Sequence, residues 1–228
     1  MLISHLSLTN FRNYRTLDLS LPPGVSVFAG QNAQGKTNVL EAVYLLATLR
    51  SPRTESDAEL VAWNTIAEES GPARIKGSIE RGAATYEVEL QLLGRGDIPA
   101  DPEIPTPVSA ASRRIRVNGL PRKAGEAAGI LNAVFFSTLD IDLITGSPSV
   151  RRRYIDLTLT QVDARYRQHL AEYGKVMPQR NALLKLVQER RSDPAELDFW
   201  DAQLARSGAY ITSARARAIS DLDRLAQI

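Results

Sequence analysis

The 228-residue sequence contains no cysteine and only two histidines, His5 and His169. Without cysteine the chain has no disulfide framework, no cysteine-ligated zinc and no thiol nucleophile. The two histidines lie far apart in sequence and form no His-Glu-x-x-His pair, so a histidine-based metal site is not expected. The missing cysteines also fit a reducing compartment.

Long apolar runs and a strong excess of one charge are also missing. No stretch reaches the roughly 18 apolar residues of a membrane span, and the N-terminus lacks the basic start and apolar centre of a signal peptide. We therefore expect a soluble, cytoplasmic protein. Lys and Arg (28) nearly balance Asp and Glu (26). Only the distribution of charge, and not its sum, can therefore argue for nucleic acid.

Periodicity predicts an α/β first part, with a mixed sheet, over residues 1–147. Apolar residues at three- and four-residue spacing predict a helix from Lys36 to about Leu49. Residues 94–112 carry four prolines and predict a surface loop. Alternating or continuous apolar runs predict strands over 2–8, 16–21, 25–29, 73–80, 85–93, 113–117 and 133–136, of which 25–29 and 133–136 are expected to be buried.

Residues 148–228 predict an arm of two long antiparallel helices. Ser147 before Pro148 is typical of a helix start, and apolar residues then recur at about 3.5-residue spacing as far as Val187. Asp193 and Glu196 predict a capping box that begins the second helix. Pro178 should kink the first helix.

A phosphate-binding loop is the most specific motif in the chain. The eight residues Gly30, Gln31, Asn32, Ala33, Gln34, Gly35, Lys36 and Thr37 fit the Walker A pattern G-x-x-x-x-G-K-[ST]. The loop follows a predicted strand and opens a helix, as the motif requires. Backbone N–H groups would cradle the phosphates, Lys36 would reach the β- and γ-phosphates, and the Thr37 hydroxyl would bind Mg²⁺. The sequence therefore predicts ATP and Mg²⁺ as ligands.

A complete ATPase site needs a second motif, an apolar strand that ends in an aspartate able to hold Mg²⁺. The nearest candidate is Asp140, but it stands several residues beyond the apolar run 134–136 and close to the helix start at Ser147. We reject it as a Walker B aspartate. No complete set of catalytic residues is therefore expected in this chain, and whether it is an enzyme stays open.

Several motifs together resemble the bacterial RecF family of DNA replication and repair proteins. They are Leu8-Thr-Asn-Phe-Arg-Asn-Tyr14, the loop extended to Asn38, Leu40-Glu-Ala-Val-Tyr-Leu-Leu46, Arg53-Thr with Asp57-Ala-Glu-Leu60, Gly146-Ser-Pro-Ser-Val-Arg-Arg-Arg153 through Asp156, and Gln179-Arg-Asn-Ala-Leu-Leu-Lys185. The resemblance covers the whole chain. It implies a head like that of ABC and SMC ATPases, an ATP-dependent homodimer, binding of gapped or double-stranded DNA, and action with RecO and RecR in loading recombinase at gaps and stalled forks.

The resemblance also assigns Arg12 a place beside the nucleotide phosphates, with an exposed turn arginine as the alternative. Two positions depart from the family pattern: Pro52, where a histidine is usual, and Thr138-Leu-Asp140, which replaces Pro-Glu-Asp. The family continues into a signature motif and a Walker B aspartate that this sequence does not contain. The chain is therefore expected to be an N-terminal part of such a protein, with apolar sheet edges exposed.

Basic residues gather in two places that are candidates for DNA contacts. Arg113, Arg114, Arg116, Arg122 and Lys123 lie on a predicted hairpin with Asn118-Gly119 as its turn, and alternation places Arg114 and Arg116 on one face. Arg151 and Arg152 open the arm with Arg153. Such residues bind phosphates without reading sequence; the alternatives are a charged edge strand and arginines that lie along a helix start.

Three functions remain open on the sequence. The first is an ATP-binding DNA repair protein of the RecF type. The second is a non-catalytic module that binds nucleotide and a partner. The third is a P-loop kinase for a small molecule, which the long arm disfavours.

Overall fold

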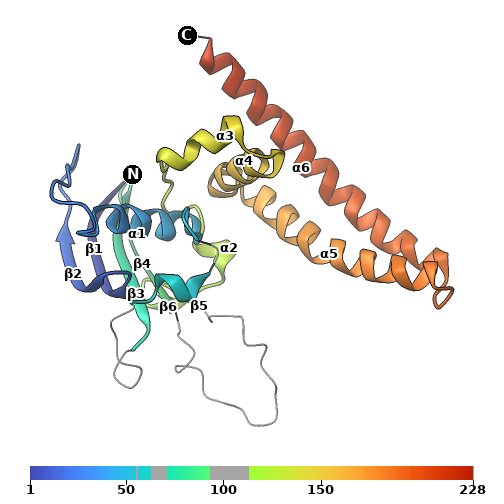
Figure 1. Cartoon of the computed structure of the whole chain (residues 1–228), viewed down its shortest axis with the longest axis horizontal. Helices are drawn as coiled ribbons and strands as arrows, with labels where there is room; N and C mark the ends of the chain where they lie inside the picture. The colour runs from blue at the N-terminus through green and yellow to red at the C-terminus, as the bar shows by residue number, and fades with distance from the viewer. Residues whose placement is uncertain (55, 63–70, 93–112, 228) are drawn as a thin grey trace. The chain divides into compact units, whose positions relative to one another are not determined.

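The computed structural model describes residues 1–54, 56–62, 71–92 and 113–227. They form two units, Met1–Ser137 and Thr138–Ile228, each with its own apolar core (Figure 1). The division proposed from the sequence, after residue 147, falls inside the second unit. The proline-rich segment 94–112 lies outside the described residues. Within the described part of the chain, no helix is both long and apolar enough to cross a bilayer.

The first unit is an antiparallel sheet with the order β2-β1-β3-β4-β5-β6. The five strands predicted over 2–8, 16–21, 73–80, 85–93 and 113–117 form within a few residues of their expected bounds. Asn118 and Gly119 both have positive φ (51° and 76°), as the tight β5–β6 turn requires. The bounds are β1 Leu2–Phe11, β2 Tyr14–Ser20, β3 Ala73–Arg81, β4 Ala84–Leu92, β5 Arg113–Val117 and β6 Leu120–Pro121.

Helix α1, Lys36–Thr48, covers one face of this sheet (Figure 1). Leu6, Leu8, Ile75 and Leu90 are at most 1% exposed and form the core beneath it. The approach is close, because a Cβ on Gly77 of β3 would lie 2.6 Å from Cδ1 of Leu46. Alternation sends polar and charged side chains to the opposite face. Two shorter helical turns complete the unit, η1 Asp57–Leu60 and α2 Ala124–Ala127.

Two predicted buried strands do not form. Residues 25–29 and 133–136 are neither strand nor buried as expected: Val25, Val27, Val134 and Phe136 are 83–93% exposed. An apolar run becomes a strand only when a neighbouring strand accepts its backbone hydrogen bonds, and the described residues provide none for these two. The described sheet is consequently antiparallel throughout, where a mixed sheet was expected.

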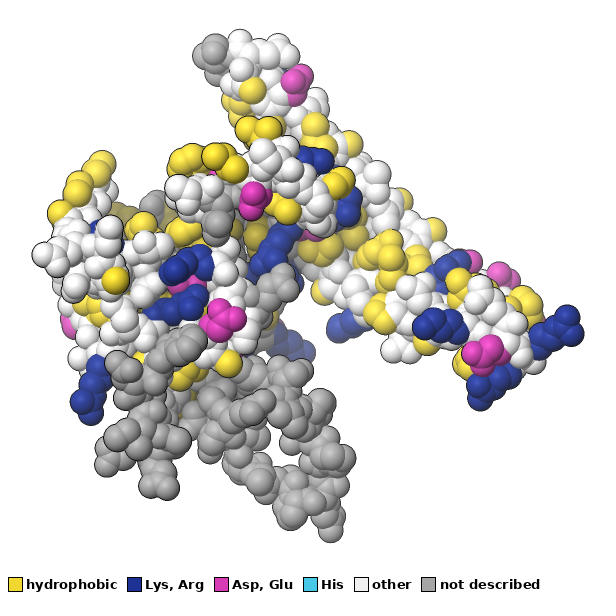
Figure 2. Space-filling model, viewed as in Figure 1, with side chains coloured by type: hydrophobic (Ala, Val, Ile, Leu, Met, Phe, Trp, Pro, Cys, Tyr) yellow, Lys and Arg dark blue, Asp and Glu magenta, His cyan; other side chains and the backbone are white. Residues whose placement is uncertain are grey.

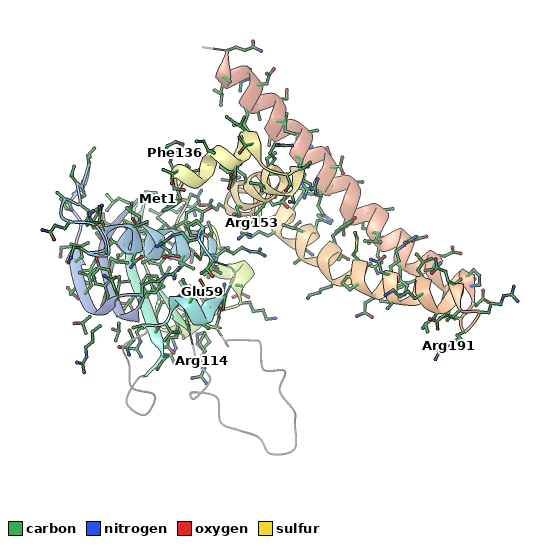
Figure 3. The ribbon with its side chains drawn as sticks, viewed as in Figure 1. Met1, Glu59, Arg114, Phe136, Arg153 and Arg191 are labelled. Carbon is green, nitrogen blue, oxygen red and sulfur yellow. The ribbon has the colours of Figure 1, made fainter. Side chains whose placement is uncertain are left out.

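These two segments instead border an open apolar groove of about 450 Å³ beside α1. Met1, Phe28, Leu40 and Phe136 are among its lining residues, and Figure 3 labels Met1 and Phe136. Hydrophobic side chains are also visible on the molecular surface in Figure 2.

The second unit is a helical arm whose long antiparallel pair is α5 and α6 (Figure 1). The capping box predicted at Asp193 and Glu196 is present and precedes α6.

Two details of the arm differ from expectation. Ser147 precedes the first long helix without capping its backbone, because its hydroxyl bonds that of Ser149 (2.6 Å). The bounds are η2 Thr138–Ile141, α3 Asp142–Thr145, α4 Pro148–Val162, α5 Ala164–Gln188, η3 Pro194–Glu196 and α6 Leu197–Ala226.

The second difference is that the predicted first long helix is two helices, α4 and α5. The break falls at Asp163, whose carboxylate accepts hydrogen bonds from the backbone N–H groups of Arg165 and Tyr166 and so caps α5. Burial by itself raises the pKa of Asp163, but these bonds and the Tyr210 hydroxyl outweigh it and hold that pKa below its ordinary value of 3.8.

Candidate functional site

The Walker A loop connects the segment after β2 to the first turn of α1. Its backbone needs left-handed conformations at Gly30 (φ 149°), Ala33 (φ 64°) and Gly35 (φ 98°), of which only the two glycines are free of Cβ strain. Gly35 is the residue from which α1 begins, so the positive end of the helix dipole lies at the loop. The described structure therefore confirms that the motif opens a helix, whereas the strand predicted before it, over 25–29, does not form.

Lys36 lies folded back over the loop. Its Nζ donates to the carbonyl oxygens of Gly30 (2.8 Å) and Gln31 (2.5 Å). Gln31, Asn32, Ala33 and Gln34 are exposed, whereas Gly35 is buried. The Lys36 ammonium can therefore exchange these two neutral carbonyls for phosphate oxygens. Hydrogen bonds to charged phosphate oxygens are stronger than those to neutral carbonyls.

Thr37 is exposed at the start of α1 and is the loop's one side chain of the type that binds Mg²⁺. Among the described residues, no group of three or more His, Asp or Glu side chains could hold a metal ion. A magnesium ion would therefore depend on nucleotide phosphate oxygens in addition to Thr37. That donor set fits Mg²⁺, which commonly combines few protein ligands with phosphates and water.

The β1–β2 turn packs directly against the loop. A Cβ on Gly35 would lie 2.7 Å from Oδ1 of Asn13 and 2.7 Å from the hydroxyl of Tyr14. Asn13 Oδ1 also accepts a hydrogen bond from Nδ2 of Asn38 (2.7 Å), one residue beyond Thr37. Burial raises the pKa of Tyr14 above its ordinary value of 10.0, so this hydroxyl stays protonated at neutral pH. The turn thus fixes the last glycine of the loop.

Arg12 comes from the same turn but is bound to α1. Its Nε and Nη2 donate to the two carboxylate oxygens of Glu41 (3.0 and 2.7 Å), and its Nη1 donates to the carbonyl of Glu59 (2.8 Å). The side chain is 13% exposed. Arg12 is therefore not the exposed turn arginine of the alternative interpretation, and its place beside the phosphates stays a prediction.

Sequence reasoning missed Glu41, which is fully buried in α1. It also receives hydrogen bonds from the Ser51 hydroxyl (2.5 Å) and from Nη1 of Arg53 (3.4 Å). The expected apolar stripe placed Leu40 inside, yet Leu40 is 47% exposed. A buried carboxylate requires paired donors, and these come from the β1–β2 turn and the 51–54 segment. Helix periodicity gives no sign of such distant partners.

The predicted hairpin cluster divides into residues with different partners. Arg113 is bound internally, with Asp57 and the carbonyl of Leu49 as its acceptors. Arg114 and Arg116 are exposed on one face, as predicted, while Ile115 between them is buried. Arg122 pairs with Glu126 (3.5 Å), one turn along, and Lys123 is exposed.

Ile115 and Val117 lie in the core beneath α1, so alternation places Arg114 and Arg116 on the opposite, polar face of the sheet; Figure 3 labels Arg114. Arg74 and Lys76 of β3 share this face, where they pair with Glu89 (3.1 Å) and Glu87 (2.8 Å) on β4. Glu80 of β3 and Asp18 of β2 also lie on this face, so its described part carries basic and acidic side chains side by side.

The second predicted cluster opens α4. Arg151 donates to the carbonyls of Leu143 (3.3 Å) and Gly146 (3.0 Å), which places its charge at the C-terminal end of the short helix α3. Arg152 is exposed. Asp140 lies in the 3-10 turn η2 and not at the end of a strand, which agrees with its rejection as a Walker B aspartate.

Comparisons with known proteins give one consistent answer. The model of the AAA ATPase domain matches residues 1–83. The DNA replication and repair protein RecF of Chloroflexus aurantiacus is 42% identical over 232 residues, which cover 99% of this chain and 58% of the relative. That of Herpetosiphon aurantiacus is 41% identical, with 100% and 59% covered. The chain matches the N-terminal part of RecF.

Solved structures agree with the sequence comparison. The recombination mediator protein RecF, determined with ATP, superimposes with a TM-score of 0.83 at 30% identity over 96% of this chain and 54% of its own. The RecF–ATPrS structure gives 0.79 at 30% identity over 97% and 55%. The α/β class and the helical arm are therefore similar to those of the solved RecF structures. The chain spans a little over half the length of these RecF relatives.

Proposed function

We propose that this chain is the nucleotide-binding part of an ATP-dependent DNA repair protein of the RecF type. The observation that carries the proposal is the exposed Walker A loop at the start of α1, with the Lys36 ammonium held by two loop carbonyls. The RecF structures of similar fold were determined with ATP and ATPrS in the RecFOR pathway, which supports ATP as the ligand and RecO and RecR as partners.

Magnesium would bind with the nucleotide, through Thr37 and phosphate oxygens. We propose that the 228-residue chain binds ATP without efficient turnover, because the described residues present no carboxylate on a strand end beside the loop. We propose the ATP-dependent homodimer implied by the family for the whole protein, since this chain spans a little over half the length of its RecF relatives.

Equilibrium titration of the 228-residue chain with ATP and Mg²⁺ tests nucleotide binding. Lys36→Ala should weaken ATP binding at least a hundredfold, because it removes a charge-assisted contact to the phosphates. The matched control is Lys76→Ala, which removes a lysine from the opposite face of the sheet and should leave ATP affinity unchanged. Equal affinity of wild type and Lys36→Ala would contradict the proposed site.

Release of phosphate, measured on the same samples, separates binding from turnover. We expect ATP to bind while phosphate release stays near the buffer background. Turnover at the rate of a complete ATPase head would contradict the claim that the catalytic half is absent.

For DNA, we propose that the polar face of the sheet contacts the phosphate backbone through Arg114 and Arg116. Neither arginine has an acidic partner among the described residues, unlike Arg113 and Arg122. Contacts of this kind are sequence-blind and depend steeply on salt. The same surface would serve double-stranded and gapped DNA.

Replacing Arg114 and Arg116 together by Glu should weaken binding to a duplex at least tenfold and reduce the slope of log K against log[salt] by about 2. Arg190→Glu with Arg191→Glu makes the same change of charge at the α5–α6 tip (Figure 3) and serves as the control. A duplex affinity that does not fall with added salt would refute backbone contacts by any of these residues.

A further inference from the structure

The packing of the helical arm changes part-way along its two long helices, α5 and α6 (Figure 1). The buried apolar core of the arm, which Leu159 of α4 also contacts, consists of Tyr166, Ile211 and Ala214. From 177 to 206 every residue is described, and none of them is buried. Val176 is the last buried residue of α5, and Ser207 is the first of α6. Residues 177–206 are therefore a loosely packed tip, and the rest of α5 and α6 is a well-packed base.

The backbone of α5 is weakest at the same level. The helix continues through Pro178, which has no backbone N–H, so the carbonyl of Gly174 lacks its usual helical donor four residues later. Gly174 is itself a poor helix former, because it loses the most backbone freedom on folding. A Cβ on Gly174 would meet nothing within 4 Å, so no close contact requires glycine there. A missing hydrogen bond and a flexible residue therefore lie within one turn of the point where burial ends.

Helix α6 has a glycine at this level too. Gly208 lies against the ring of Tyr173, whose Cε2 would be 3.5 Å from a Cβ on this glycine. The neighbouring Ser207 is fully buried; its hydroxyl donates to Glu172 (3.0 Å) and lies 3.4 Å from Nδ1 of His169. A buried polar contact of this kind fixes the register of two helices. The base therefore ends at a fixed contact, directly beside a flexible position in each helix.

The tip has fixed contacts of its own. Arg180 of α5 donates to the carboxylate of Asp201 of α6. At the far end, the capping box of Asp193 and Glu196 orders the turn between the two helices, where Figure 3 labels Arg191. The two helical segments of the tip are thus joined to each other at both ends. They can change direction together without separating.

We propose that the arm bends at this level, about a hinge formed by Gly174 and Pro178 of α5 and Gly208 of α6. The base is held by its buried core, and the tip moves as a unit. A hinge needs only a few positions that absorb changes in φ and ψ. Bending would redirect the exposed side chains of the tip, such as Phe199, which is 60% exposed. The hinge depends on neither ATP binding nor DNA binding.

The lack of cysteine allows a direct test, because two introduced cysteines are then the only sites for a spin label. Gln168→Cys and Lys185→Cys place labels at exposed positions of α5 on either side of the hinge, about 25 Å apart along the helix. Electron–electron distance measurements on the 228-residue chain should give a distribution at least twice as wide as that of a control pair. The control pair, Ala209→Cys with Asp223→Cys, spans α6 within the base. Equal widths would overturn the proposal.

Proline and glycine replacements identify the hinge positions. Pro178→Ala gives the Gly174 carbonyl its donor back and should narrow the distribution to the width of the control pair. Gly208→Ala should narrow it as well, since the methyl group makes an ordinary contact with Tyr173 and alanine favours the helix. Pro194→Ala is the matched control, because a proline in the first turn of η3 replaces no helical bond, and the width should stay unchanged. An unchanged width in Pro178→Ala or Gly208→Ala would refute this hinge.

Hydrogen exchange distinguishes bending from unwinding of the tip. If the tip bends as a unit, the amides of residues 181–187 should exchange at least about a hundredfold more slowly than those of an unstructured peptide in the wild type. Exchange at the rate of an unstructured peptide would show that this end of α5 unwinds, and the hinge would be rejected even if the distance distribution were wide.

Discussion

The backbone conformation of the phosphate loop depends on single residues, above all on Gly35. Gly35 combines a left-handed backbone with a crowded neighbourhood, because Asn13 and Tyr14 occupy the space that a Cβ would need. The glycine is therefore required twice, once by its conformation and once by its contacts. Sequence reasoning found this residue through the motif, whereas the contact with the β1–β2 turn emerged only from the fold.

Gly35→Ala should accordingly weaken ATP binding by tenfold or more, because both Asn13 and the loop must shift to admit the methyl group. Gly24→Ala is the matched control: its φ of 101° is similar, yet a Cβ there meets nothing within 4 Å. Both variants should lose about 1 kcal/mol of stability from the strained backbone. Calorimetric titration with ATP distinguishes them, and equal affinities would mean that the Gly35 contacts do not matter.

The burial of Glu41 could not be predicted from the local sequence pattern of α1. Three- and four-residue spacing placed α1 and most of its buried face correctly, but it did not show that Leu40 is exposed and Glu41 buried. A carboxylate is tolerated inside only because Arg12, Ser51 and Arg53 meet it there. Those partners come from two places in the sequence, the β1–β2 turn and the 51–54 segment, on either side of Glu41.

Elements of the arm are joined by a polar cluster on three helices. Asp156 of α4 accepts hydrogen bonds from the Tyr166 hydroxyl of α5 (2.5 Å) and from Nε and Nη2 of Arg215 of α6 (both 2.9 Å). Tyr166 is fully buried. Burial, followed by the bond to Asp156, raises the pKa of Tyr166 to about 12. The hydroxyl therefore stabilises the arm in its protonated form.

Tyr166→Phe should lower the free energy of unfolding by about 1–3 kcal/mol, because Asp156 loses a buried donor. The pH dependence has a definite sign. Since folding raises this pKa from 10.0 to about 12, the contribution is complete below pH 10 and disappears as the pH rises through 12. Urea unfolding at pH 8 and at pH 11.5 measures the difference.

The gap in stability between wild type and Tyr166→Phe should shrink at the higher pH. Tyr154→Phe is the control, since Tyr154 is 37% exposed in α4 and should show little effect at either pH. A gap that grows with pH would show that the cluster stabilises the tyrosinate instead.

Elements with local signals were predicted well, and elements that depend on distant partners were not. The capping box at Asp193 and Glu196 and the Asn118-Gly119 turn were found because each is encoded within four residues. The break at Asp163 was missed because the apolar spacing continues across it from Leu159 to Tyr166, both in the arm core. The capping residue Asp163 ends one helix and begins the next, while the spacing of apolar residues continues unchanged.

At the scale of the whole molecule, the sequence predicted only the part of the nucleotide site that comes from one continuous segment. The loop and the start of α1 were located from Gly30–Thr37 alone. The β1–β2 turn, Glu41 and Arg53 were not assigned together, since they meet only when β1, α1 and the 51–54 segment pack. The match to RecF covers 99% of this chain but 58% of the relative.

Segments 25–29 and 133–136, which form no strand, expose apolar side chains on the surface of the first unit. Val27 and Phe136 are 83% and 87% exposed, and Phe136 lines the groove beside α1. Apolar surface of this kind binds hydrophobic dyes and contributes nothing to stability while it stays in water. Replacing both residues by serine should therefore reduce dye fluorescence about twofold or more and leave the thermal midpoint unchanged within a few degrees.

Val88→Ser is the comparison variant, because it replaces a buried apolar side chain and not an exposed one. Val88 is fully buried in β4 beneath α1, so serine there should cost about 2–4 kcal/mol through lost packing and an added hydroxyl. Its dye fluorescence should rise as its thermal midpoint falls. If the Val27 and Phe136 replacement instead lowered the midpoint as far as Val88→Ser does, those two side chains would be packed in the folded chain, and segments 25–29 and 133–136 would be buried strands after all.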